Sequence, residues 1–383
     1  MQGWMIALII VACVVAALAV AFLIGALAAV HIILGRRKTP VAKPDTVDDP
    51  DRYGVNRAWF DGVADVTETL ELTAYDGIAL SALLIKQKTH AGRVAVCCHG
   101  YGATQRAMQV QAKLFYDRGF DVLLPAMRGH GASGGKVGMA WLDRFDLLRW
   151  VDKLVSDYGE KVSIALCGIS MGGSTAVAAA GMNPPPQVKC VIDDCGFSSQ
   201  VDVYGAHIGK VPKALGLLPL AVGARLVHGY SIYDADITKL AATMSVPALF
   251  IHGEADRFVP PTLGQKLYDS CASADKRFFS VPNAAHALAY AVDREGYSQA
   301  FNSFVDEYVE GSEFVFDSNT LIPEKPSVPE KDGDDGAVDT DDVAAAPTAE
   351  TPSGEQTADG ASSVGDAGPD TSAPVESDTA LSD

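Results

Sequence analysis

Three residues in this chain have the types and the order that nucleophilic catalysis requires. Ser170 lies in Gly168-Ile169-Ser170-Met171-Gly172, Asp256 follows His252-Gly253-Glu254-Ala255, and His286 ends Asn283-Ala284-Ala285-His286. A histidine can take the proton of a serine hydroxyl and return it to a leaving group, while an aspartate orients the imidazole and stabilises its protonated form. We therefore predict that Ser170, His286 and Asp256 act together as nucleophile, base and acid, with a covalent acyl-enzyme as intermediate.

The residues around Ser170 predict how its hydroxyl is presented. An apolar run at 162–167 reads as a strand, and a run of small residues at 174–181 reads as a helix. The G-x-S-x-G segment between them is then a sharp strand-to-helix turn that exposes the serine at a helix N-terminus. We expect Gly168 and Gly172 to be required there, because a side chain at either position would collide with the neighbouring strand or helix.

Other residues compete for the acid and base roles. Asp193 and Asp194 follow the next predicted strand, and Glu254 lies close to Asp256. His99, His130 and His252 each adjoin a glycine, so turn structure explains them. We favour Asp256 and His286 because they follow later strands in the order serine, acid, histidine.

Further segments carry a family resemblance: His99-Gly100-Tyr101-Gly102, the run 128–134 (Arg-Gly-His-Gly-Ala-Ser-Gly) and the run 138–144. With the serine turn and the segment around Asp256, they resemble the α/β-hydrolase fold serine hydrolases. The likeness is to bacterial membrane-anchored esterase, lipase or serine aminopeptidase-like members, over residues 60–311. Ala126 departs from the pattern, since relatives often have Asp there. The resemblance implies an oxyanion hole made by the backbone N–H groups of Met171 and Tyr101.

The middle of the chain predicts an α/β fold with a mostly parallel, doubly wound sheet. Residues 67–73 and 78–86 read as a hairpin around Asp76-Gly77. Continuous apolar runs at 93–98, 121–125, 162–167 and 188–193 are typical of strands covered on both faces, and later strands are expected around Phe250 and Phe279. The alternation stops over 197–236, where the fold implies a helical lid.

The first 38 residues predict a membrane anchor. No charged residue occurs from Trp4 to Leu34, which exceeds the roughly 20 apolar residues needed to span a bilayer. Arg36, Arg37 and Lys38 follow at once, so the positive-inside tendency favours a cytoplasmic-facing catalytic domain. Residues 39–59 read as a linker. The cysteines read as small buried residues without disulfide or metal spacing.

The end of the chain, residues 312–383, reads as a disordered acidic tail. From Glu313 onward it holds 18 acidic and two basic residues, so it carries most of the net charge of −18. It has too few large apolar residues to offset the entropy of ordering. We interpret it as a solubilising appendage, with partner binding as the alternative.

The expected function is hydrolysis of a small-molecule or lipid carboxylic ester at a membrane. A peptidase or amidase acting through the same three residues is the alternative, and a non-catalytic anchored scaffold is a third hypothesis. Gly129–Gly134 satisfies G-x-G-x-x-G but continues as a loop, so no dinucleotide site is expected. The chemistry requires no metal or organic cofactor, and the sequence shows no basic patch for nucleic acid. The oligomeric state is not predicted.

Overall fold

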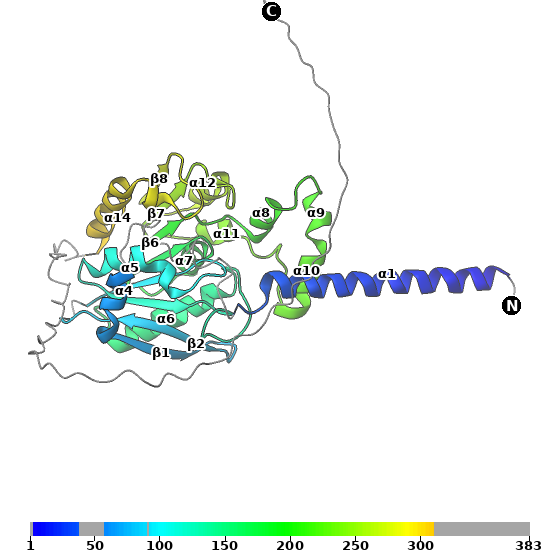
Figure 1. Ribbon diagram of the computed structural model, residues 1–383, viewed down its shortest axis with the longest axis horizontal. Coiled ribbons are helices and arrows are strands. Elements are labelled where there is room, and N and C mark those ends of the chain that lie inside the picture. Colours follow the sequence, from blue (N-terminus) through cyan, green and yellow to red (C-terminus); the bar gives the residue numbers. More distant parts are fainter. Residues whose placement is uncertain (1–2, 38–56, 90–91, 310–383) are drawn as a thin grey trace, which may run out of the picture. The chain divides into compact units, whose positions relative to one another are not determined.

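A computed structural model describes residues 3–37, 57–89 and 92–309, and its central element is an eight-stranded sheet (Figure 1). The strands lie where the sequence predicts them, with boundaries within two residues of the predicted ones where these were given. Their bounds are β1 (Thr67–Thr73), β2 (Ala79–Ile85), β3 (Arg93–Cys98), β4 (Asp121–Ala126), β5 (Ser163–Ile169), β6 (Val188–Asp194), β7 (Ala248–Gly253) and β8 (Lys276–Val281).

The strand order is β1-β2-β4-β3-β5-β6-β7-β8. β1 and β2 form the predicted antiparallel hairpin, with Thr67 opposite Ile85, and β2 pairs antiparallel with β4. Every later pair is parallel. The prediction of a mostly parallel α/β sheet is therefore confirmed. Since parallel strands share one direction, the turns after β3, β5, β6, β7 and β8 meet at one edge of the sheet.

Helices cover both faces of this sheet, and each face has its own apolar core. Alternate residues of a strand point to opposite faces, so Val94 and Val96 of β3 belong to one core and Ala95 and Cys97 to the other. The first core packs against α6 (Asp143–Tyr158), α7 (Met171–Ala180), α11 (Ile237–Ala241) and α12 (Pro261–Ser270). The second packs against α4 (Arg57–Gly62), α5 (Gln109–Tyr116), α13 (Ala289–Val292) and α14 (Arg294–Tyr308).

The region predicted as a helical lid, 197–236, contains three helices: α8 (Gln200–Gly205), α9 (Lys213–Gly216) and α10 (Leu218–His228). Two buried polar side chains join this region to the loop before α6. Gln200 Nε2 donates to Met139 O over 2.9 Å, and Tyr230 Oη donates to Gly138 O over 3.3 Å. The helical character expected of this insertion is confirmed.

The apolar N-terminal segment is a single helix, α1 (Gly3–Leu34), long and apolar enough to cross a membrane. Its side chains are exposed along most of its length, but Ala26, Val30 and Leu34 are buried against the domain. Backbone hydrogen bonds fix the chain just beyond it: Val137 N–H donates to Leu34 O over 3.0 Å, and Arg37 N–H donates to Gly129 O over 2.6 Å.

Two predicted segments lie mostly or wholly outside the described residues. The linker predicted at 39–59 is described only from Arg57, where α4 begins, so its last residues are helical. The acidic tail predicted at 312–383 lies entirely outside the described residues, and the description of the catalytic domain predicted at 60–311 ends at residue 309.

Candidate active site

The turn between β5 and α7 holds Ser170 in a strained backbone conformation, with φ 56° and ψ −116°. The two glycines of the motif permit this turn. A Cβ on Gly168 would lie 2.2 Å from the backbone carbon of Gly172, and a Cβ on Gly172 would lie 1.9 Å from Cys98 O in β3. The collisions expected from the sequence are therefore present. Ser170 N–H donates to Asp194 O over 2.7 Å, which ties the turn to the end of β6.

Ser170, His286 and Asp256 are brought together although they lie on three separate turns. His286 Nε2 is 3.0 Å from Ser170 Oγ, and His286 Nδ1 is 2.6 Å from Asp256 Oδ2. A carboxylate only accepts, so Nδ1 carries the imidazole proton and Nε2 is free to accept the serine proton. The arrangement can deprotonate Ser170 as it attacks a carbonyl carbon.

Asp256 is buried and its carboxylate is held by four groups. Oδ1 accepts from the N–H groups of Phe258 and Val259, each over 2.8 Å, and Oδ2 contacts His286 and lies 3.5 Å from His252 Nε2. Burial raises the pKa of Asp256, but the hydrogen bonds from His252 and His286 and the charge of His286 outweigh it and lower this pKa overall. Asp256 is therefore ionised across the physiological range and can stabilise a protonated His286.

The alternative acids at the end of β6 have different surroundings. Asp194 Oδ2 accepts from Tyr297 Oη over 2.9 Å, and burial raises the pKa of Asp194 to about 6. Asp193 is packed against Gly173 and Gly196, and burial raises its pKa to about 8. The carboxylate in contact with His286 is that of Asp256.

Two of the histidines that were alternative candidates for the base hold loops at the site through hydrogen bonds. His99 donates from Nδ1 to Gly100 O over 2.8 Å and accepts from Met127 N–H over 3.1 Å. His130 donates from Nδ1 to Arg128 O over 3.0 Å and accepts from Gly102 N–H over 2.9 Å. Burial lowers both pKa values, that of His99 to about 3. Both rings are thus neutral, and their nitrogens are occupied by loop structure.

The third histidine is one that sequence reasoning undervalued. His252 Nε2 donates to Val259 O over 2.9 Å, and the same nitrogen faces Asp256. It thereby closes the turn that carries Asp256. The i, i+4 spacing of His252 and Asp256 was the available signal, although turn structure alone seemed sufficient to explain the histidine.

The predicted oxyanion residues flank the serine. Met171 is the first residue of α7, where N–H groups have no intrahelical acceptor. The turn that contains Tyr101 is close as well, because a Cβ added to Gly100 would lie 3.6 Å from Ser170 Cβ. Their roles as backbone donors stay a prediction. The Tyr101 side chain has a contact that the sequence did not suggest: its hydroxyl donates to Ile33 O of α1 over 2.7 Å and contacts Arg37.

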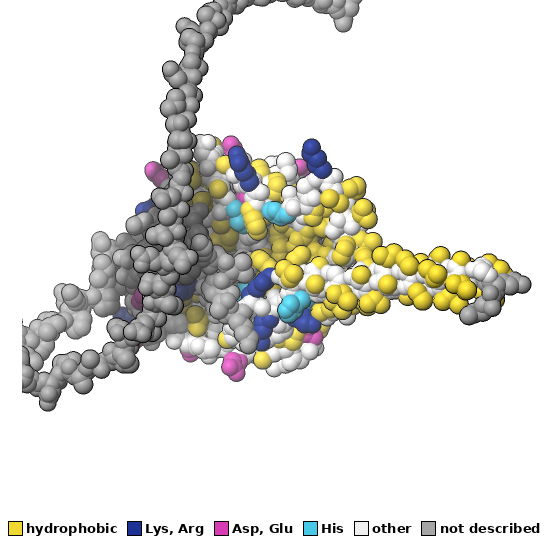
Figure 2. All heavy atoms as spheres, turned by 45° about the vertical axis from the view of Figure 1, so that its right-hand side comes forward, with side chains coloured by type: hydrophobic (Ala, Val, Ile, Leu, Met, Phe, Trp, Pro, Cys, Tyr) yellow, Lys and Arg dark blue, Asp and Glu magenta, His cyan; other side chains and the backbone are white. Residues whose placement is uncertain are grey.

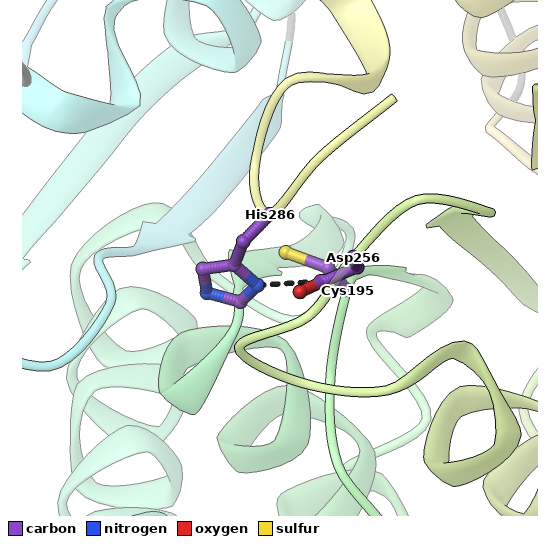
Figure 3. A group of neighbouring side chains, drawn as sticks. All are labelled: Cys195, Asp256 and His286. Carbon is purple, nitrogen blue, oxygen red and sulfur yellow. Dashed lines mark hydrogen bonds and ion pairs between the residues drawn. The ribbon is translucent and has the colours of Figure 1, made fainter. Parts of the chain in front are cut away.

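Cys195 lies beside Asp256 and His286 (Figure 3). A ligand atom from each of Cys195, Asp256 and His286 falls within 4.8 Å of the others, which is a spacing that a metal can also use. Here, however, the imidazole and the carboxylate are hydrogen-bonded directly to each other at 2.6 Å, and burial and neighbouring aspartates raise the pKa of the Cys195 thiol. A neutral thiol is a poor metal ligand, so the group fits proton transfer better than metal binding.

Phe258 is a further residue at the site that the sequence did not identify. Its ring centroid lies 4.9 Å from that of His286 and 5.0 Å from that of His207 in the lid region. The three rings connect the predicted lid with the predicted base. No local pattern marks such a contact, because the residues are more than 25 positions apart in sequence.

Comparison with known proteins places these features in a family. A family model described as serine aminopeptidase, S33, matches residues 89–201 and 221–293, which include all three residues of the hydrogen-bonded chain. The uncharacterized protein YqkD of Bacillus subtilis is 27% identical over 222 residues, 57% of this chain and 72% of its own. A thermostable monoacylglycerol lipase of a Bacillus species is 23% identical over 225 residues, 51% of this chain and 83% of its own.

Among solved structures, the esterase Pf2001 of Pyrococcus furiosus superposes with a TM-score of 0.52 at 20% identity. The match covers 63% of this chain and 92% of the esterase. At this identity the likeness concerns the fold, which is the α/β-hydrolase fold with its mixed eight-stranded sheet.

Proposed function

Because the chain belongs to the α/β-hydrolase family, we propose that it is a serine hydrolase that cleaves carboxylic esters. Ser170 attacks the carbonyl carbon, His286 takes its proton and passes it to the leaving alcohol, and Asp256 stabilises the protonated imidazole. Water, activated by His286, then releases the acid. The observation that carries this proposal is the continuous chain from Ser170 Oγ through both nitrogens of His286 to Asp256.

The oxyanion of the tetrahedral intermediate needs preorganised N–H donors. We assign these to Met171 and Tyr101, since one begins α7 directly after the nucleophile and the other lies in the turn that packs against Ser170. The positive end of the α7 dipole adds to the stabilisation of negative charge at this point.

An aminopeptidase activity is the second candidate, and the description of the matching family model favours it. Such an enzyme must also bind the free amino group of its substrate, usually with an accessible carboxylate. Around Ser170, in the described part of the chain, Asp194 and Asp256 are both buried and engaged by Tyr297 and His286. Ester cleavage requires no such group, and a monoacylglycerol lipase is among the relatives. Both points support ester cleavage over aminopeptidase activity.

We further propose that α1 anchors the enzyme in the cell membrane as a single span. Its length and composition support this assignment. Arg36 and Arg37 directly follow the helix, and the positive-inside tendency then keeps the catalytic domain on the cytoplasmic side.

A paired substrate series tests the activity. The full chain in detergent is assayed with p-nitrophenyl esters from acetate to palmitate and with aminoacyl p-nitroanilides. Turnover of one or more esters with negligible release from the anilides supports the proposal. Preferential release from the anilides would replace it with the aminopeptidase, and the chain-length profile of the esters measures the size of the acyl site.

A further inference from the structure

The end of α1 is built into the catalytic domain. Val30 and Leu34 are members of the same apolar core as β3 and α7, and Gly223 of the lid helix α10 lies directly against α1. A Cβ on Gly223 would be 2.3 Å from Ala26 O, so the two helices are in close contact. Together with the backbone hydrogen bonds of Leu34 and Arg37, this contact makes the anchor a fixed part of the domain.

The length of α1 sets the depth at which this junction lies. Its exposed apolar side chains run from Trp4 to Ile32, about 42 Å at 1.5 Å per residue. The hydrocarbon core of a bilayer is only about 30 Å thick. The helix is therefore long enough to cross the bilayer with its last turns at the membrane interface, or to cross it at a tilt. In both cases α10, which packs beside Ala26, is held at that interface.

The part of the lid next to this junction has an exposed apolar surface, which we term the lid face. It consists of Val211, Leu215, Leu218 and Leu226, whose side chains are 41% to 66% exposed. Figure 2 shows hydrophobic side chains along α1 continuing onto the part of the domain where the helix joins it. Isolated exposed apolar residues are common, but four within 16 residues beside a membrane helix indicate a contact surface.

Basic side chains lie close to the lid face in sequence. Residues 203–233 hold three basic residues, Lys210, Lys213 and Arg225, and no aspartate or glutamate. Asp202 and Asp234, at the two ends of this segment, pair with Lys213 over 3.4 Å and with Arg225 over 4.0 Å. All three basic side chains are exposed. Apolar side chains flanked by basic ones are the pattern of a segment that lies on an anionic lipid surface.

The lid also reaches the catalytic residues. His207, two residues beyond α8, packs on Phe258 with ring centroids 5.0 Å apart. Phe258 packs in turn on His286 with ring centroids 4.9 Å apart. The lid region is therefore connected through two ring contacts to the proposed base.

We propose that the lid face docks on the lipid bilayer beside α1 and that the enzyme takes its acyl ester from the bilayer. The choice of substrate rests on the proposed ester hydrolysis, whereas the membrane contact does not. The site then receives esters dissolved in the membrane, because the lid region, whose His207 contacts Phe258 beside His286, lies at the same interface as the anchor.

Measuring how deeply the lid face lies in the bilayer tests the membrane contact, and this measurement does not depend on enzymatic activity. The full chain with Cys13→Ala is labelled with an environment-sensitive dye at a single new cysteine, either Leu215→Cys or Leu226→Cys. Each labelled protein is inserted into vesicles of phosphatidylcholine and phosphatidylglycerol that contain a spin-labelled lipid as quencher. Lys161→Cys, which precedes β5 at the opposite edge of the sheet, is the matched control. We expect blue-shifted, lipid-quenched emission at 215 and 226 and water-like emission at 161. Emission at 215 and 226 as unquenched as at 161 would overturn the docking.

Kinetics test the substrate source. We expect the double variant Leu215→Ser, Leu226→Ser to lower the ratio of turnover of a vesicle-embedded monoacylglycerol to turnover of soluble p-nitrophenyl acetate about tenfold. An unchanged ratio would overturn delivery from the bilayer. Lipid quenching in both labelled lid variants, together with a wild type that hydrolyses neither ester, would overturn the proposed function and leave the membrane contact supported.

Discussion

The hydroxyl of Tyr101 donates a hydrogen bond to the backbone carbonyl of Ile33 over 2.7 Å. One residue belongs to the turn beside the proposed nucleophile and the other to the last full turn of the apolar helix. The guanidinium of Arg37 lies 5.2 Å from the centroid of the same ring. The loop that we assign to the oxyanion hole is thus braced by the segment that we assign to the membrane anchor.

This brace predicts a measurable effect of Tyr101→Phe. The substitution keeps the backbone N–H, so ester hydrolysis should stay within about tenfold of wild type, but it removes a hydrogen bond worth roughly 1 kcal/mol. We expect faster amide hydrogen exchange in residues 33–37 and at Val137, which donates to Leu34 O. Tyr233→Phe is the control, since that exposed hydroxyl has only a 3.5 Å contact with Ala214 O. Equal exchange in the two variants would contradict the brace.

A matched pair of aspartate variants identifies the acid. Asp256→Asn removes the carboxylate that fixes the tautomer of His286, and the expected loss in kcat is roughly 10⁴-fold. Asp194→Asn changes a carboxylate that accepts from Tyr297, and we expect a loss below about tenfold for this more remote group. Steady-state kinetics on one ester measure both. Comparable large losses would mean that the β6 carboxylate shares the catalytic role.

The glycines of the serine turn predict a steric effect on stability. Gly172→Ala places a Cβ against the backbone oxygen of Cys98, and overpacking of this kind costs about 3 kcal/mol or more. Gly62→Ala is the control, because no atom lies within 4 Å of the corresponding Cβ. Thermal unfolding should show a marked loss for the first variant and little change for the second. A Gly172→Ala protein as stable as wild type would show that the turn is less crowded than described.

Asp193 predicts a dependence of stability on pH. Burial raises the pKa of Asp193 to about 8 in the folded chain, against about 4 in an unfolded one. The folded state therefore binds more protons than the unfolded state between these values, so this group makes stability fall as pH rises from about 4 to about 8. The Asp193→Asn variant has no titratable group at this position, so its unfolding temperature should decline less steeply than that of the wild type between about pH 4 and about pH 8. An identical slope would exclude Asp193 as the source.

Much of this architecture could be predicted because local patterns carry it. The strands at 93–98 and 188–194 are largely apolar, and the turn at Ser170 is flanked by two glycines that nothing larger can replace. The order of Ser170, Asp256 and His286 was sufficient to select the residues that the fold brings into hydrogen-bond distance.

The contacts between distant segments were not predictable in the same way. The contact between Arg37 and Tyr101, 64 positions apart, depends on where α1 packs against the domain. No sequence periodicity encodes this packing position. The packing of Phe258 between His207 and His286 likewise arises only when the lid region and two loops meet. α4 begins within the segment read as a linker, because its polar and aromatic residues lack a clear helical period.

Covalent labelling tests the central claim most directly. The full chain and its Ser170→Ala variant are treated with a fluorophosphonate probe, and the site of attachment is mapped by mass spectrometry. We predict one adduct on Ser170 in the wild type and none in the variant, because only a serine whose proton His286 can accept is reactive enough. A folded wild type that takes up no probe, or a Ser170→Ala variant labelled as strongly as wild type, would contradict the assignment of Ser170 as the nucleophile.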